Sequence, residues 1–135
     1  MHTNQTVLEQ FSVPALALEH PEAEVPVLAG NQRQGDVLVL RVTTSHGGNP
    51  IGKGVQVVAS ENSSNTHTLH GDGMWEANPR ADREGELVQG WVTVPEDGEA
   101  FLIHTEEHSA LGLAPGTYEL RRQREYAGEW RRVAD

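Results

Sequence analysis

Short runs of aliphatic and β-branched residues recur along the chain, and most are closed by glycine, proline, asparagine or aspartate. The clearest runs are VLVLRVT at 37–43, VQVVAS at 55–60, LVQGWVTVP at 87–95, AFLIHT at 100–105 and TYELRRQREY at 117–126. Short β-branched runs between turn residues are typical of strands, whereas a helix requires a longer segment with a 3.6-residue repeat. The frequent turn residues between short apolar runs argue against a helical bundle and predict a chain of short strands.

Turn residues separate these runs at intervals of about 8 to 12 residues, as in small sandwiches and barrels. We therefore predict an all-β fold, a small sandwich or partly open barrel of about eight short strands. The apolar run at 37–43 is expected to be a central strand covered on both faces. Residues 45–54 are expected to form a loop, 71–73 a turn and 96–99 a hairpin turn. The helix expected is a single turn near 105–110.

The first 34 residues differ from the rest because prolines at positions 14, 21 and 26 interrupt them. Proline lacks an amide donor and restricts the residue before it, so no long helix is expected there. Apolar residues such as Val25 and Val27 still require burial. We expect an extended N-terminal arm over 1–34, packed on its own sheet or on a neighbouring subunit, followed by one β domain over 35–135.

Charge and composition narrow the range of partners. The 135 residues carry a formal net charge of −10, and an acidic surface repels phosphate backbones, so nucleic acid is not an expected partner. The chain has no cysteine, which excludes disulfides and thiolate metal ligands. It shows neither the N-terminal pattern of a signal peptide nor an apolar run near the ~20 residues of a membrane span. We expect a cytoplasmic or virion protein that is not secreted by a signal peptide and has no membrane partner.

The first candidate site joins two histidine-bearing segments. Residues 104–108 read His-Thr-Glu-Glu-His, the H-x-x-E-H pattern of inverted zinc peptidases, but Gly112 and Pro115 follow too soon for the long helix that such enzymes need. In a looser arrangement, side chains of this segment meet histidines of a neighbouring strand and hold a divalent metal such as Zn²⁺. The alternative is that they hydrogen-bond within a loop corner. The candidate metal ligands are His67, His70, His104, Glu107 and His108.

A second candidate site lies in the arginine-rich C-terminal segment. Arg122 and Arg124 share one face of the strand expected at 117–126, whereas Arg121 lies on the other face. A planar guanidinium pairs with carboxylate or phosphate through two parallel hydrogen bonds, so this pair predicts an anion or partner patch. The alternative is that these arginines pair with acidic neighbours on a solvated strand face.

Three motifs resemble those of a group of short, functionally uncharacterised proteins of bacteria and their phages. The group shows Q-G-D-V-L, H-x-E-H and P-G-x-Y-x-V-x-x-Q-R-E-Y, and the matching segments here are 34–38, 104–108 and 115–126. Where the group tends to show G-H-x-H, this chain has NTHTLH at 65–70, so its histidines are offset. The resemblance implies a shared fold unit over 34–135 and supplies no activity.

Taken together, these patterns favour a non-catalytic module that works by protein–protein contact. The proline-interrupted arm, the segregated charge and the lack of a complete catalytic constellation all point to a homo-oligomeric or assembly component, for example a phage-type structural or accessory protein. The alternative is a histidine-rich metal-binding protein or metal-dependent enzyme that uses His67, His70, His104 and His108.

Overall fold

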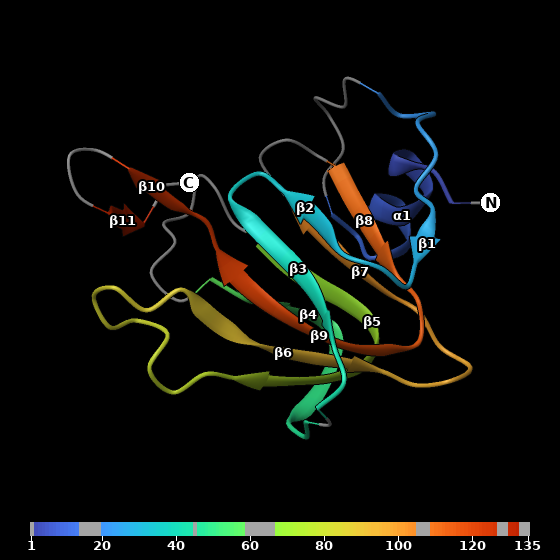
Figure 1. Cartoon of the computed structure of the whole chain (residues 1–135). Helices are drawn as coiled ribbons and strands as arrows, with labels where there is room; N and C mark the ends of the chain where they lie inside the picture. The colour runs from blue at the N-terminus through green and yellow to red at the C-terminus, as the bar shows by residue number, and fades with distance from the viewer. Residues whose placement is uncertain are drawn as a thin grey trace.

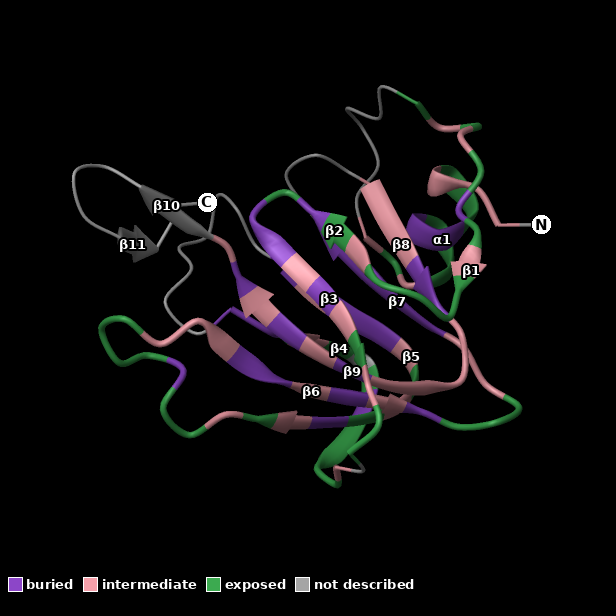
Figure 2. Cartoon of the chain, viewed as in Figure 1, coloured by how far each residue is buried: buried purple, intermediate pink, exposed green. Residues whose placement is uncertain are grey.

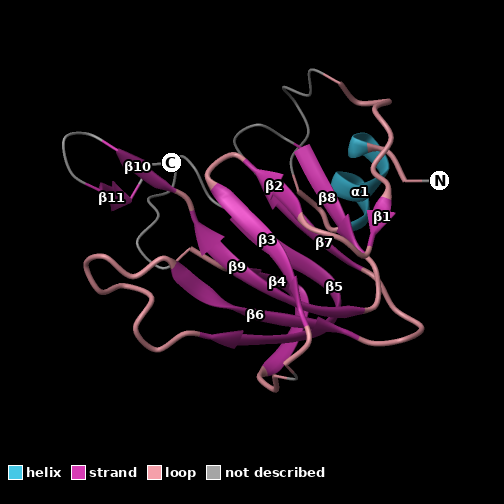
Figure 3. Cartoon of the chain, viewed as in Figure 1, coloured by secondary structure: helices cyan, strands magenta, loops and turns pink. Residues whose placement is uncertain are grey.

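A computed structural model of the chain describes residues 2–13, 20–44, 46–58, 67–104, 109–126 and 130–132 (Figure 1). The fold is mostly β, as predicted, and the main sheet curls into a half-barrel (Figure 3). The elements in chain order are α1 (Asn4–Gln10), β1 (Val27–Leu28), β2 (Gln32–Gln34), β3 (Val37–Val42), β4 (Asn49–Gln56), β5 (His67–Ala77), β6 (Val88–Val94), β7 (Ala100–His104), β8 (Ser109–Leu113), β9 (Gly116–Arg122), β10 (Arg124–Tyr126) and β11 (Trp130–Arg132).

Strand β5 is the strand from which the two wings of the sheet diverge. Along one edge it pairs with β4, and along the other its first half pairs with β7 and its second half with β6. The sheet order is β1-β8-β7-β5-β6-β9-β3-β2, so one wing runs from β5 through β7 and another through β6. Strands β10 and β11 form a separate antiparallel pair. The divergence of the two wings produces the curl of the half-barrel.

The main core is built from buried residues of β3, β4, β5, β6, β7, β8 and β9, and Figure 2 shows the buried positions of these strands in purple. The alternating side chains of the strands form this core, because every second side chain of a strand points to the same face. On β9, Tyr118 and Leu120 are fully buried, as the alternating pattern predicts, and on β3 the buried residues are Val37 and Val39. The expectation that β3 is covered on both faces is wrong: Leu38 and Leu40 are only partly buried, and β3 lies next to the edge strand β2.

Side chains from the edge strand β2 reach across to the opposite wing. The Gln32 amide donates to the Gly112 carbonyl at 2.8 Å, and the buried Gln34 amide donates to the Leu102 carbonyl at 2.9 Å. Tyr118 adds a hydrogen bond from its hydroxyl to the Ala114 carbonyl at 2.7 Å. Burial raises the pKa of this tyrosine, although the nearby Arg41 guanidinium acts in the opposite direction. These hydrogen bonds stabilise the curl at a place where the described strands form no ladder between the two wings.

Helix α1 packs on the outer face of β7 and forms a second apolar cluster with it. Val7 and Leu8 are fully buried there against Phe101 and Ile103, and Val25 completes the cluster. The helix begins at a capping box in which the Thr3 and Thr6 side chains each accept from the other's backbone amide. The described part of the arm therefore packs on its own sheet, and the expectation of a purely extended arm is wrong for 4–10.

Three expected turns differ from the structure. Residues 49–54 belong to β4 rather than to a loop, and residues 71–73 continue β5. Gly71 and Gly73 have positive φ, and other backbone lies close to both: a Cβ on Gly73 would be 2.5 Å from the Thr93 carbonyl oxygen. Residues 96–99 do not join a hairpin, since β6 and β7 both pair with β5. The helical turn expected near 105–110 falls largely on 105–108, which lie outside the described residues.

Within the part of the chain that the structure describes, no helix has the length and apolar character required to cross a membrane.

Candidate functional site

His67 and His104 lie side by side, as expected from the stacking of the two histidine segments. They are directly opposed in the β5–β7 ladder. Their rings stack with centroids 4.3 Å apart and planes 20° apart, and both side chains are buried. They point to the same face as Leu69 and Leu102, which belong to the main core. The structure thus places an imidazole pair at one end of the main core.

His70 lies on the opposite face of β5. Its Nε2 is 2.7 Å from the Thr68 hydroxyl, and its ring packs against that of Phe11 with centroids 5.1 Å apart. The five candidate metal ligands are therefore not one cluster: His67 and His104 meet, His70 is separated from them by the sheet, and Glu107 and His108 lie outside the described residues. No group of three metal-binding side chains occurs among the residues described, whereas zinc sites use three or four protein ligands.

Arg122 is a buried charged residue that pairs with Asp36. Its guanidinium lies 3.2 Å from a carboxylate oxygen of Asp36, and the two side chains are 7% and 5% exposed. Val37, next to Asp36, is paired with Arg122 across β3 and β9. Arg122 therefore faces an internal carboxylate rather than a surface patch, whereas the side chain of Arg124 lies outside the description. The alternative that arginines pair with acidic neighbours also holds for Arg121, whose Nε is 3.1 Å from Glu119.

The outer face of β6 and β9 carries an aromatic stack. The His46 ring lies on Trp91 with centroids 4.4 Å apart and planes 4° apart. The Trp91 indole N–H donates to Glu119 at 3.1 Å, and Glu76 lies 3.7 Å from His46. One face of the indole is thus occupied within the chain, and Trp91 does not offer that face to a ligand.

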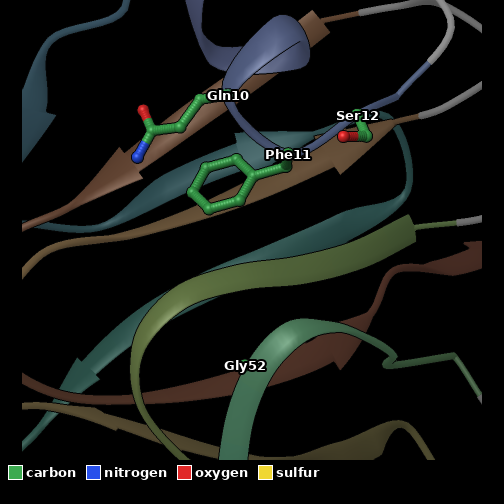
Figure 4. Close-up of a pocket in the computed structure, with 4 residues that line it drawn as sticks. All are labelled: Gln10, Phe11, Ser12 and Gly52. Atoms are coloured by element: carbon green, nitrogen blue, oxygen red, sulfur yellow. The ribbon is translucent and has the colours of Figure 1, made fainter.

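A surface pocket of about 450 Å³ lies between the end of α1 and strand β4 (Figure 4). We call it the helix-end pocket; among the described residues it is lined by Gln10, Phe11, Ser12 and Gly52. Gln10, Ser12 and Gly52 are exposed, and Phe11 is partly buried. The pocket is therefore open to solvent and combines an amide, an aromatic ring, a hydroxyl and a glycine backbone.

The Phe11 ring is held in place by its neighbours. It contacts the ring of His70 and also that of Phe101, with centroids 5.8 Å apart. His70 is in turn backed by Gly54, where a Cβ would lie only 2.6 Å from the imidazole Cε1. Glycine at position 54 therefore permits the ring to approach β4, and the stack Phe11–His70–Gly54 joins α1 to the sheet beside the pocket.

Ser12 ends the helix in an uncommon backbone conformation. Its φ is +57°, in the left-handed region, where glycine is the usual residue after a helix. The Ser12 amide donates to the Glu9 carbonyl at 3.1 Å and the Val13 amide to the Leu8 carbonyl at 2.8 Å, which is a Schellman motif. Non-glycine residues held in this region cost of order 1 kcal/mol or more and are frequent at binding sites. The pocket wall thus includes a strained residue.

Sequence reasoning missed this site. Thr3 followed by Thr6 and the apolar pair Val7-Leu8 was the available signal for a short capped helix. Nothing local places Gly52 beside residues 10–12, because that contact joins the arm to β4 through the tertiary fold.

These features define a small all-β half-barrel domain with a helix packed on one wing and an open pocket at the helix end. Residues 33–123, more than half of the chain, match the family model described as Domain of unknown function (DUF8820). The chain belongs to this family. Searches of curated proteins and of solved structures gave no match. The matched range includes His67, His104 and Gly52, whereas α1 and residues 10–12 precede it.

Proposed function

We propose that the chain is a non-catalytic binding module that contacts a protein partner at the helix-end pocket. The single observation that carries this proposal is the position of the pocket, between the end of α1 and strand β4. Three of its four described lining residues are exposed, whereas a small-molecule site encloses most of its ligand. An open pocket of this kind fits a side chain that protrudes from another protein surface.

Strand β4 gives the partner a second point of contact. Among the described strands, β4 pairs with β5 along one edge, and no described strand occupies its other edge. Pro50 and two register shifts interrupt the regular ladder, features that protect an edge from indiscriminate pairing. A partner would therefore be selected by the pocket rather than by long strand addition. The partner can be a second copy, as in an oligomer, or another subunit of an assembly.

Site-specific cross-linking tests this proposal. A photo-reactive benzoylphenylalanine replaces Gln10 at the pocket or, as the control, exposed Arg83 in the loop between β5 and β6. Each variant is irradiated in the cells that naturally make the protein. We expect a discrete protein adduct from position 10 and none from position 83. Equal adducts at both positions, or none at either, contradict the proposal. Light scattering of the purified protein then distinguishes a second copy from a different partner.

Divalent metal binding is the second candidate function, favoured by the stacked pair His67 and His104. Glu107 and His108 follow closely in the sequence and are the candidates for further ligands. Protein purified without a histidine tag is assayed for bound metal and melted with added Zn²⁺. A ligand at 100 times its Kd stabilises by about 2.7 kcal/mol, and His104→Asn is expected to abolish the effect. An unchanged melting temperature with Zn²⁺, together with metal-free protein, excludes this function.

A further inference from the structure

We propose that the helix-end pocket binds a cationic side chain of the partner, specifically an arginine guanidinium. This inference rests on the proposed protein-binding function and names the chemistry that the pocket recognises. Three features support it: the fixed aromatic ring, the polarity of the helix end, and the distribution of charge along the chain.

The aromatic ring supplies the surface on which a guanidinium stacks. Phe11 lines the pocket while His70 and Phe101 support it from the core side. A guanidinium is planar, weakly hydrated and attracted to the negative face of an aromatic ring. Because the ring is already immobilised, little conformational entropy is lost when the cation binds. The compact ammonium of lysine lacks the planar surface for this stacking.

The end of α1 supplies partial negative charge and hydrogen-bond acceptors. Peptide dipoles leave the C-terminal end of a helix negative, and the last turn of α1 contains no basic residue to offset this. The Schellman motif uses the carbonyls of Leu8 and Glu9, and Gln10 and Ser12 line the pocket with a side-chain amide and a hydroxyl, whose oxygens can accept hydrogen bonds. A guanidinium carries five N–H donors and no acceptor, which matches such a lining.

Charge along the chain also favours a cation. The net charge is −10, and no lysine or arginine occurs before Arg33, so the segment that contributes α1 is acidic. An anionic ligand would face both the acidic arm and the negative end of the helix.

A peptide pair tests the inference. The probe is a blocked peptide of glycines with one central arginine, and its control contains citrulline, which has the same shape without the charge. Each is titrated into the isotope-labelled chain of 135 residues, and the amide chemical shifts are followed. We expect the arginine peptide to shift the amides of residues 10–12 and 52 and to bind at least about fivefold more tightly than the citrulline peptide, the equivalent of ~1 kcal/mol.

Two matched variants separate recognition from folding. Phe11→Leu removes the ring that lines the pocket, and Tyr118→Leu makes the same kind of change at a fully buried ring of the main core, which does not contact Phe11. We expect about three- to fivefold weaker arginine binding in Phe11→Leu and unchanged binding in Tyr118→Leu, provided that circular dichroism shows both folded.

Each outcome supports or overturns the inference. Equal affinity for the arginine and citrulline peptides, preferential binding of a glutamate-containing peptide, or no shift at the pocket amides overturns it. If cross-linking from position 10 succeeds while the two peptides bind equally, the protein-binding function stands and the cationic partner is wrong. If neither experiment gives a signal at the pocket, both proposals fall.

Discussion

Replacing Gly54 by alanine tests the stack that joins α1 to the sheet. The added Cβ would lie 2.6 Å from Cε1 and 3.0 Å from Nδ1 of His70. The ring has little room to retreat, because Phe11 packs on it and the Thr68 hydroxyl lies 2.7 Å from its Nε2. In addition, φ at this position is +140°, which a residue with a side chain rarely adopts. The substitution therefore imposes both overlap and backbone strain.

The magnitude follows from these two terms. A strained backbone conformation costs about 1 to 3 kcal/mol, and overpacking a well-packed site costs about 1 to 3 kcal/mol. We expect Gly54→Ala to lower the free energy of unfolding by about 2 to 6 kcal/mol, a large part of the ~5 to 15 kcal/mol of a typical domain. Gly52→Ala is the matched control in the same strand: φ is +55° and no atom lies within 4 Å of the added Cβ, so only about 1 kcal/mol is lost.

Urea unfolding followed by tryptophan fluorescence measures both variants, and the shift in midpoint at constant slope gives the difference. A double variant with His70→Ala removes the overlap but not the strain, so its loss should be smaller than the sum of the two single losses. If Gly54→Ala and Gly52→Ala unfold within about 0.5 kcal/mol of each other, the close approach of His70 to β4 is not what stabilises this region.

Three further predictions concern other contacts. Burial raises the pKa of Tyr118, so above pH 10 the folded chain holds the phenol proton more tightly than the unfolded chain; its contribution is complete below pH 10 and is lost as the pH rises through the folded pKa. Tyr118→Phe should remove that decline in the free energy of unfolding, measured in urea as the pH is raised above about 10, at a loss of ~1 kcal/mol at neutral pH. Arg122→Met leaves the buried Asp36 carboxylate without its guanidinium and should cost about 3 to 5 kcal/mol, measured by denaturant unfolding, whereas adding Asp36→Leu should recover part of that loss; equal losses would show that the pair is not coupled. Ser12→Gly relieves the left-handed strain and should raise the unfolding free energy by ~0.5 kcal/mol while weakening arginine binding; lower stability would contradict the strain.

Alternation along the strands was predictable from the sequence. The period of two places Tyr118 and Leu120 on one face, and it separates His67 from His70 in the segment that became β5. The meeting of His67 and His104 followed from the same pattern, since both segments were expected to be neighbouring strands. Side-chain periodicity is a local property of the extended backbone, so it does not depend on which strand becomes the pairing partner.

Glycine positions were misinterpreted because glycine has two structural uses. At 71–73 it permits a close approach of neighbouring backbone inside a continuous strand, although the same residues are typical of turns. Only the tertiary neighbours, such as the Thr93 carbonyl, decide between these uses. Gly52 and Gly54 were likewise interpreted as loop residues, although residues 49–54 belong to β4 and Gly54 permits the close approach of the His70 ring.

Helix α1 was missed because its stability is not local. Seven residues form too few helical hydrogen bonds to be stable alone, so burial of Val7 and Leu8 against β7 must supply the difference. The helix-end pocket depends on the same contact, and for that reason it could not be read from the sequence either.

The pairing of β3 has a consequence for synthesis of the chain on the ribosome. Besides β2, the partner of β3 is β9, whose last residue is Arg122. A two-stranded hairpin is at best marginally stable in water, so the β2–β3 segment acquires a lasting partner only after β9 has also been translated. The β2–β3 segment must therefore stay soluble until then, and slow translation of the residues between β3 and β9 would prolong the interval in which it is exposed to chaperones and proteases.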